Sequence, residues 1–342
     1  MAIITWVGGS SNNFNDKLNW SPQSVPVATS DVVIAPAAAT SIIAANDTIN
    51  SLTTNANTTL SVTATDTFTI LDHSTAQNPT GTSINGGTLL LNSACDLFLS
   101  GTFDNTGVLT TQAASDVWLT GTLLNIGTVN QRGDFNVGNS TTAGRVVNHV
   151  GGHWTITGNV DVVNGGAAGS TLSNAGTLAR AGSGVTDVGV TTINSGKVSV
   201  GSGQMEFLRP VTNTGTMAAT GTGASLWIDR AISGTGKIDI SGGGAVHLLQ
   251  GADAGQHVQF LGAGALDLNA PGVFAGIIGG FTSHDLIDLV KTPATGATFA
   301  SGVLTVQNGA ATVASLHLTG AYTSANFNLT SDNHGGTLIH YA

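Results

Sequence analysis

Residues 96–129 read DLFLSGTFDNTGVLTTQAASDVWLTGTLLNIGTV, and the second half of this stretch repeats the first. At an offset of 20 residues, Asp96 matches Asp116, and Asn-Thr-Gly at 105–107 matches Asn-Ile-Gly at 125–127. In each copy, apolar and polar residues alternate, which is the period of a strand with one buried face. A unit of about 20 residues is too small to bury its own apolar face, so we predict that successive copies stack on one another.

An Asn-x-Gly element recurs about once per unit, and we predict that it marks a corner of each coil. Glycine accepts a positive φ, and asparagine tolerates the left-handed region while bonding to nearby backbone. Stacked asparagines can also hydrogen-bond to one another as a ladder. The predicted corner residues are Asn105, Gly107, Asn125, Gly127, Asn174, Gly176, Asn194, Gly196, Asn213 and Gly215.

These features predict an all-β parallel β-helix, or β-solenoid, made of coils of about 20 residues. Composition agrees, because strand and turn residues dominate and the chain contains 47 glycines. We predict an N-terminal cap at 1–41, solenoid repeats at 42–269 and an antiparallel β module at 270–342. Two longer repeats predict loops near 138–145 and 164–170.

The two ends follow a different pattern from the repeat. Trp6, Phe14 and Trp20 cluster near the start of a chain with only 5% aromatic residues, which predicts packing in a cap; stacking on carbohydrate is the alternative. Near the C-terminus, residues 303–318 alternate around Asn-Gly and predict a hairpin, and residues 327–341 predict a second. Tyr341, in that second hairpin, is a further candidate cap or interface residue.

Composition also limits the classes of partner. The net charge is −10, and charged residues make up only 8% of the chain. Binding to nucleic acid requires clustered basic residues, so we expect no nucleic-acid partner. Apolar runs are too short for a membrane helix, so we expect no membrane insertion. Cys95 is the only cysteine, which excludes a disulfide framework. The first residues lack the basic and apolar regions of a secretory signal, so we expect no cleaved N-terminal signal.

The acidic residues at the start of successive units are the main candidates for chemistry. Asp96, Asp116 and Asp134 would stack at one corner, where we interpret them as a solvated row; the alternative is a cation site, for which calcium would be the ion. Arginines and histidines show no fixed offset from an acidic pair, and His149 and His153 flank a glycine turn. We therefore predict no catalytic residues, no enzyme activity and no cofactor.

The repeats resemble those of filamentous-haemagglutinin-type and autotransporter-passenger β-helices of bacteria. Residues 5–34 (TWVGG…NNFNDKLNWSPQSVP…SDVVI) resemble the opening module of large bacterial surface proteins. Residues 242–289, together with the two predicted hairpins, resemble C-terminal regions of proteobacterial adhesin-like exported proteins. The resemblance implies a secreted or cell-surface protein, exported by a type I-like route whose signal lies uncleaved at the C-terminus.

We therefore hypothesise an extracellular structural protein whose partner is another copy of itself, joined end to end into surface fibres or matrix by strand addition. The alternative is a monomeric adhesin or a carbohydrate-binding protein of surface glycans. A third hypothesis is a polysaccharide-active enzyme that uses carboxylates such as Asp96 and Asp116.

Overall fold

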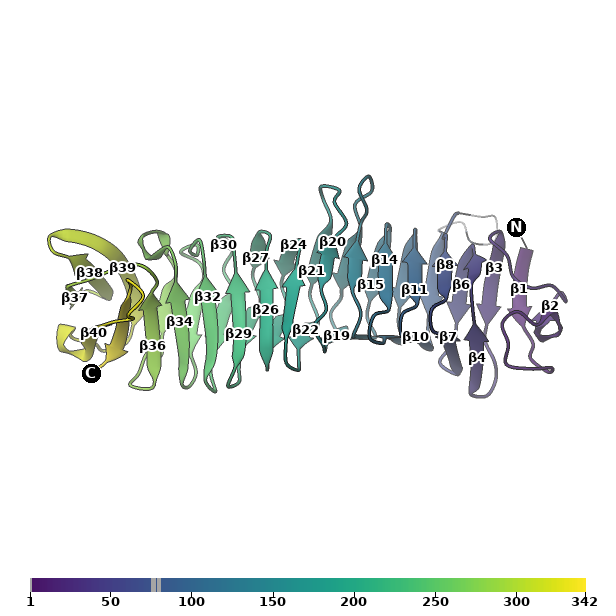
Figure 1. Ribbon diagram of the computed structural model, residues 1–342, viewed down its shortest axis with the longest axis horizontal. Helices are drawn as coiled ribbons and strands as arrows, with labels where there is room; N and C mark the ends of the chain where they lie inside the picture. The colour runs from purple at the N-terminus through teal and green to yellow at the C-terminus, as the bar shows by residue number, and fades with distance from the viewer. Residues whose placement is uncertain (1, 75–77, 79–80) are drawn as a thin grey trace. The chain divides into compact units, whose positions relative to one another are not determined.

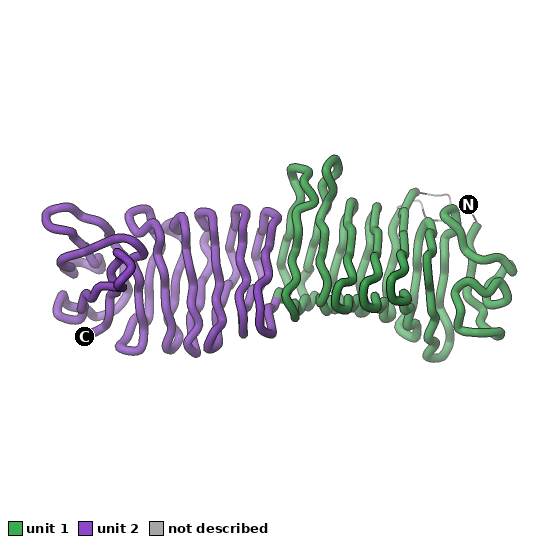
Figure 2. Tube along the Cα trace, viewed as in Figure 1, with its two compact units in different colours: residues 1–178 green, residues 179–342 purple. Residues whose placement is uncertain are grey.

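The structure is a computed structural model that describes the chain except for residues 1, 75–77 and 79–80. It confirms the all-β parallel β-solenoid, with coils of about 20 residues and 3% helix. The described residues form about 13 turns. The chain divides into two compact units, Met1–Leu178 and Ala179–Ala342, which Figure 2 shows in green and purple. Strand β22, Thr177–Arg180, contains the boundary.

In the first unit, each full coil contributes one strand to each of three sheets, which we name A, B and C (Figure 1). Sheet A contains β2 (Trp20–Ser21), β1 (Ala2–Trp6), β3 (Ser30–Ile34), β6 (Ser51–Thr54), β9 (Thr82–Asn85), β12 (Thr102–Asn105), β15 (Thr122–Asn125), β18 (Arg145–Asn148) and β21 (Thr171–Asn174). Sheet B contains β4 (Thr40–Ala44), β7 (Thr58–Val62), β10 (Thr88–Leu91), β13 (Val108–Thr111), β16 (Thr128–Gln131) and β19 (His153–Ile156). Sheet C contains β5 (Asp47–Ile49), β8 (Thr67–Ile70), β11 (Asp96–Leu99), β14 (Asp116–Leu119), β17 (Phe135–Val137) and β20 (Val162–Asn164).

The second unit continues the same three-sheet pattern and ends on antiparallel strands. Its sheet A contains β24 (Thr191–Asn194), β27 (Val211–Asn213) and β30 (Ile232–Ser233). Its sheet B contains β25 (Lys197–Val200), β28 (Thr216–Ala219), β31 (Lys237–Ile240), β33 (His257–Phe260), β35 (Ile277–Gly279), β39 (Ala311–Thr319), β38 (Val303–Asn308) and β37 (Gly296–Ala300). Its sheet C contains β23 (Val185–Val188), β26 (Gly203–Phe207), β29 (Ala224–Ile228), β32 (Gly244–Leu248), β34 (Gly264–Leu268), β36 (Asp285–Leu289), β41 (Thr337–Tyr341) and β40 (Phe327–Ser331).

The register of the strands repeats the alignment of the sequence. In β11 and β14, Asp96 lies opposite Asp116 and Leu97 opposite Val117, one coil apart. Burial alternates along these strands, so every second side chain points into the coil. Stacking therefore places apolar side chains from successive coils in contact and gives the small unit its core.

Parallel pairing extends into both predicted terminal modules. At the N-terminus, β1 pairs in parallel with β3, inside the segment predicted as a cap. At the C-terminus, β35 pairs in parallel with β39 before the antiparallel strands take over. Both predicted hairpins are confirmed, since β38 pairs antiparallel with β39 and β40 with β41. Helical structure in the described residues consists of the short 3-10 turns η1 (Lys17–Asn19), η2 (Pro271–Val273) and η3 (Ser324–Asn326).

The two predicted loops lie in the first unit, at 138–144 and 165–170. They connect sheet C to sheet A, from β17 to β18 and from β20 to β21, and Figure 1 shows them projecting past the other coils near β20 and β21. The Ala167 N–H donates to the Asn139 carbonyl at 2.8 Å, so one loop is stacked on the other.

Candidate functional site

The predicted corner asparagines form a hydrogen-bonded ladder inside the solenoid. Asn105 Nδ2 donates to Asn125 Oδ1 at 2.7 Å, and its second proton goes to the Thr128 carbonyl at 3.0 Å. These asparagines end strands of sheet A and are fully buried, because they occupy inward positions of the alternation. Equivalent side-chain bonds join Asn85 to Asn105, Asn125 to Asn148, Asn148 to Asn174 and, in the second unit, Asn194 to Asn213. The ladder satisfies buried amides and has no open face for a ligand.

The corner glycines are required for a different reason from the one predicted. Gly107 does not have a positive φ, so conformational freedom is not what selects it. A Cβ at Gly107 would lie 2.0 Å from the Gly87 carbonyl oxygen of the preceding coil, and one at Gly127 would lie 2.1 Å from the Gly107 oxygen. Gly176 meets the Gly152 oxygen, and Gly215 the Gly196 oxygen, in the same way. The corner is thus a column of backbone too close-packed for any side chain.

The left-handed conformation occurs at another corner, between sheets B and C. Ala94 has a φ of 59° and Ala114 a φ of 57°, at the same place in successive coils. An L-residue with a side chain is strained there, although the sequence places alanine at both positions. In these two coils the close-packed corner therefore uses asparagine and glycine and the left-handed corner uses alanine, whereas the equivalent left-handed corners of the second unit include glycines such as Gly223 and Gly243.

The acidic row stacks in space, and two of its members accept hydrogen bonds from backbone. Asp116 Oδ1 accepts the Asp134 N–H at 3.2 Å, and Asp134 Oδ1 accepts the Asp161 N–H at 2.8 Å. Asp96 Oδ1 accepts the Trp118 indole N–H at 3.4 Å. Burial raises the pKa of Asp116, and the backbone bond opposes that rise. Each carboxylate thus ties its coil to the next one.

The N-terminal aromatic residues pack against one another. Trp6 and Trp20 meet edge to face with ring centroids 5.0 Å apart, and Phe14 meets Trp20 at 4.9 Å. The Trp20 indole N–H donates to the Phe14 carbonyl at 2.6 Å. Trp20 is 1% exposed and Trp6 7%, so neither indole face is open to a sugar. The Phe14 ring also packs against the Phe68 ring, with centroids 5.8 Å apart, and thereby covers the first coils of the core.

Tyr341 belongs to an aromatic cluster at the C-terminal end of the second unit. Its ring lies 6.1 Å from Tyr322 and 6.4 Å from Phe281, and its hydroxyl accepts a hydrogen bond from Asn326 Nδ2 at 3.3 Å. The Tyr322 hydroxyl donates to the Phe281 carbonyl at 3.0 Å. Tyr341 lies on β41, so an antiparallel strand at the end of the second unit contributes to this cluster.

One row of functional groups in the second unit was not predicted. Trp227, His247, Asp267 and Asp288 face outward at the same register position of successive strands of sheet C. The indole stacks on the imidazole with centroids 3.8 Å apart, and His247 Nδ1 lies 2.7 Å from Asp267 Oδ2. Burial, followed by the nearby Asp267 charge, raises the pKa of Asp288 to about 6. The spacing of about one coil between these residues is the signal that could have found them.

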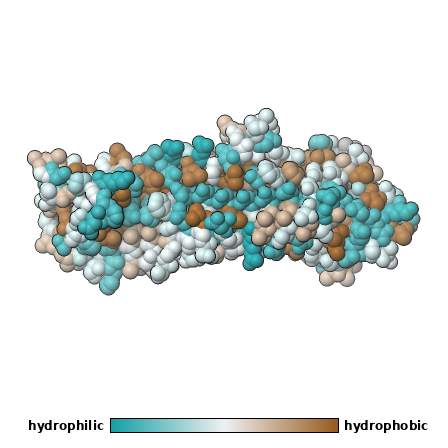
Figure 3. Space-filling model, viewed as in Figure 1, coloured by the Kyte–Doolittle hydropathy of each residue, from teal (hydrophilic) through white to brown (hydrophobic). Residues whose placement is uncertain are grey.

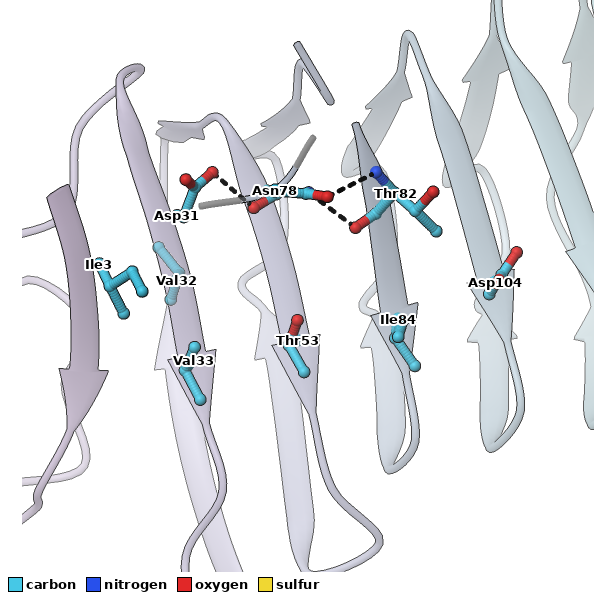
Figure 4. A pocket seen from close by; sticks show the side chains of 10 residues that line it. Ile3, Asp31, Val32, Val33, Thr53, Asn78, Thr82, Ile84 and Asp104 are labelled. Atoms are coloured by element: carbon cyan, nitrogen blue, oxygen red, sulfur yellow. Dashed lines mark hydrogen bonds between the residues drawn. The ribbon is translucent and has the colours of Figure 1, made fainter. Parts of the chain in front are cut away.

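A second unpredicted feature is a groove of about 420 Å³ on the outer face of sheet A in the first unit. It lies over β1, β3, β6, β9 and β12, and Figure 4 shows Ile3, Val33, Thr53 and Ile84 on neighbouring strands, with Asp104 on the strand beyond. On β6 the groove is lined by the short side chains of Ser51 and Thr53. Its chemistry combines aliphatic carbons, hydroxyls and carboxylates.

A buried carboxyl group lies at a coil corner near this groove. Asp72 is only 6% exposed and accepts a hydrogen bond from the Ser83 hydroxyl, and its Oδ2 has no partner among the described residues. Burial raises its pKa to about 7, with smaller contributions from the charges of Asp104 and Asp31. The carboxyl group is therefore partly protonated near neutral pH.

Among the described residues, no group of three or more histidine, cysteine or acidic side chains is arranged to hold a metal ion. None of the helices in this part of the chain is long and apolar enough to cross a membrane. A scan against protein-family models finds no match, and a search of curated proteins finds no significantly similar sequence. Inference about function therefore starts from the geometry of this chain.

Proposed function

We propose that this chain is a structural, non-catalytic β-solenoid that associates with a second copy of itself through β40. The observation that carries the proposal is the outer edge of this strand, at the end of sheet C in the second unit, with which no described strand pairs. An edge strand with free backbone groups is a template for another strand. The extracellular setting belongs to the same proposal, and its support is the resemblance of the sequence to bacterial surface proteins.

The pairing of β40 with β41 determines which of its backbone groups point outward. Ala342 N–H donates to the Asn326 carbonyl at 2.9 Å, so the next hydrogen-bonded pairs toward the turn are Asn328 with His340 and Thr330 with Leu338. The N–H and C=O of Leu329, and those of Ser331, therefore point away from β41. In the described part of the chain, no hydrogen bond reaches these outward backbone groups. The strand reads FNLTS and lacks the charges and prolines that commonly protect an edge.

The other terminal strands are short or at least partly covered, and β2 and β30, which end sheet A, have two residues each. The outer edge of β1 pairs antiparallel with β2. That of β4 is covered by a loop, in which Phe14 N–H donates to the Ile43 carbonyl at 2.8 Å and Ile43 N–H to the Asn12 carbonyl at 2.8 Å. On β37, Phe299 N–H donates to the Ser324 hydroxyl at 2.8 Å. The first strand of sheet C, β5, has only three residues.

This asymmetry favours a closed pair over a fibre. A fibre requires two complementary open edges, whereas a two-fold pair requires one edge that matches itself. Two β40 strands can pair antiparallel about Leu329, because the outward N–H and C=O of the two Leu329 residues then face each other and the Ser331 N–H faces the Phe327 carbonyl of the other copy. The Phe327 N–H already donates to the Ser324 carbonyl and takes no part in this pairing. The head-to-tail fibre expected from the sequence stays a prediction, and pairing at β40 is the form of self-association that the edges favour.

Sedimentation velocity across protein concentrations tests this proposal. The native chain should shift from monomer to dimer, and Leu329→Pro should remain monomeric, because proline removes the outward N–H without removing a bond to β41. Leu329→Val keeps the N–H and should dimerise normally. A native chain that stays monomeric at high concentration would refute the proposal, as would a dimer that survives in Leu329→Pro with β40–β41 pairing intact by NMR.

One further observation favours glycan binding as a second candidate function. Trp118 is 36% exposed on the outer face of sheet C in the first unit and stacks on Phe98 with ring planes 9° apart. Exposed aromatic side chains with a nearby carboxylate are a common contact for sugars. Glycan-array binding that is lost in Trp118→Ala and kept in Trp20→Phe would support this role, and an array without hits would remove it.

A further inference from the structure

The outer face of sheet A in the first unit contains the groove between Ile3 and Asp104 described above, which no part of the proposed function uses. Two rows of side chains build it. One row contains Asp31 and Ser51. The other contains Val33, Thr53, Ile84 and Asp104, which lie on successive strands of sheet A.

The walls of the groove are aliphatic and partly exposed. Ile3 is 48% exposed and Ile84 38% exposed, although both lie within a sheet. None of the described residues that line the groove is aromatic. Sugars are usually held against aromatic faces, so the lining favours a ligand with flexible aliphatic carbons over a sugar ring. Figure 3 shows a face on which hydrophobic residues occur in small separate groups among polar ones.

The charged groups of the groove are all negative. Asp31 is 5% exposed, and its Oδ1 accepts hydrogen bonds from Asn50 Nδ2 and the Ser51 hydroxyl, both at 2.7 Å. Asp104 is half-buried, and its Oδ1 is buried without a hydrogen-bond partner. None of the ten described residues that line the groove is lysine, arginine or histidine.

Asp104 also borders a smaller hollow of about 180 Å³, lined by Leu124, Ile126 and His149. The apolar surface therefore continues on both sides of this carboxylate. Burial raises the pKa of Asp104, and His149 is the charged neighbour that opposes the rise. Asp104 thus has an unbonded carboxylate oxygen between two hollows, and among the described residues that line them His149 is the one basic side chain.

We propose that this groove binds an extended peptide segment of another protein through a lysine or arginine side chain. Such a side chain has an aliphatic stem and a cationic head. The stem would lie against Val33 and Ile84, and the head would reach Asp104. Arginine fits this role best, because its planar group binds a carboxylate through two hydrogen bonds.

Fluorescence anisotropy with the full chain tests the inference. The probe is a fluorescein-labelled peptide, Gly-Ser-Ile-Arg-Ile-Arg-Ile-Gly-Ser, and the comparison peptide has glutamate in place of both arginines. We expect saturable binding of the arginine peptide only, which weakens as salt rises. Asp104→Asn should weaken binding about fivefold or more. Thr53→Trp fills the hollow over β6 and should abolish binding.

Asp239→Asn is the matched control, because Asp239 is another half-buried aspartate whose pKa burial raises, on sheet B of the second unit. It should bind the arginine peptide as the native chain does. The inference is overturned if neither peptide binds, if both bind equally, or if Asp104→Asn and Thr53→Trp bind like the native chain. None of these results depends on whether β40 mediates dimerisation.

Discussion

Asn105 Nδ2 lies 2.7 Å from Asn125 Oδ1 on the next coil, and both side chains are fully buried. Asn105 also accepts from Asn85 Nδ2 at 2.7 Å, so it is a link in a chain of amides within the core. Removing a buried amide from such a chain leaves each of its hydrogen-bond partners unsatisfied, and each unsatisfied partner lowers the stability of the fold. The ladder therefore sets the register of the coils and also stabilises them.

The first prediction concerns this link. Asn105→Ala leaves a donor of Asn85, the Asn125 oxygen and the Thr128 carbonyl without their partner, and should lower the free energy of unfolding by about 2–4 kcal/mol. Urea unfolding followed by circular dichroism measures the change. Asn130→Ala is the control: Asn130 lies on the outer face with one bond to Thr110 at 3.3 Å, and its loss should cost under about 0.5 kcal/mol. Equal effects would contradict the ladder's role.

The second prediction compares two corners of one coil. Gly107→Ala places a Cβ against the backbone oxygen of Gly87 and should lower the free energy of unfolding by roughly 3 kcal/mol or more. Ala114→Gly relieves a left-handed backbone and should raise it by about 0.5–1 kcal/mol, after the greater chain entropy of glycine is subtracted. Urea unfolding midpoints of the two variants and the native chain measure both changes. The close-packed-column explanation fails if Gly107→Ala folds with native stability.

The third prediction follows from Asp72, whose pKa is raised from 3.8 to about 7 by burial. The folded protein keeps this proton up to about pH 7, whereas the unfolded chain releases it near pH 4. The contribution to stability is therefore complete below pH 4 and is lost as pH rises toward 7, by at most about 4 kcal/mol. Asp72→Asn should remove this dependence and be more stable than the native chain at pH 8.

Asparagine also suits the backbone at this position, where φ is 50°. Thermal unfolding at a series of pH values from 4 to 8 gives the comparison. The exposed Asp253→Asn should follow the native curve throughout. Parallel curves for Asp72→Asn and the native chain would show that Asp72 titrates normally.

The fourth prediction concerns Asp288, whose pKa is raised to about 6 by burial first and by the Asp267 charge second. Carbon-13 NMR of the side-chain carboxyl should report that midpoint. Asp267→Asn should lower the Asp288 pKa only part of the way toward its ordinary value, because burial remains the larger cause. A fall to the ordinary value would mean that the neighbouring charge, and not burial, dominates.

Several elements could be predicted from the sequence because their cause is local. Alternation of apolar residues in a stretch such as 96–99 is visible without any contact, and so is the Asn-Gly signal of the hairpin between β38 and β39. The cap residues Trp6, Phe14 and Trp20 were also visible as a local excess of aromatic residues. Their burial depends on packing, and only the structure shows their rings closed against one another.

The groove could not be predicted, because it depends on an irregular step between coils. Thr53 lies beside Ile84, 31 residues later, whereas Ile84 lies beside Asp104, 20 residues later. A repeat of about 20 residues therefore does not align the two walls of the groove. The open edge of β40 likewise depends on which neighbours cover the other strands.

The sequence by itself determined the coil: its length of about 20 residues, its alternation and the positions of its corners. These properties arise within a unit, from strand periodicity and turn residues. Only the tertiary structure decided what each corner requires, because the glycine column and the asparagine ladder are contacts between coils. It also decided that Trp227, His247, Asp267 and Asp288 share one row, and that Asp72 is buried. Such proximity and desolvation exist only once the coils are stacked.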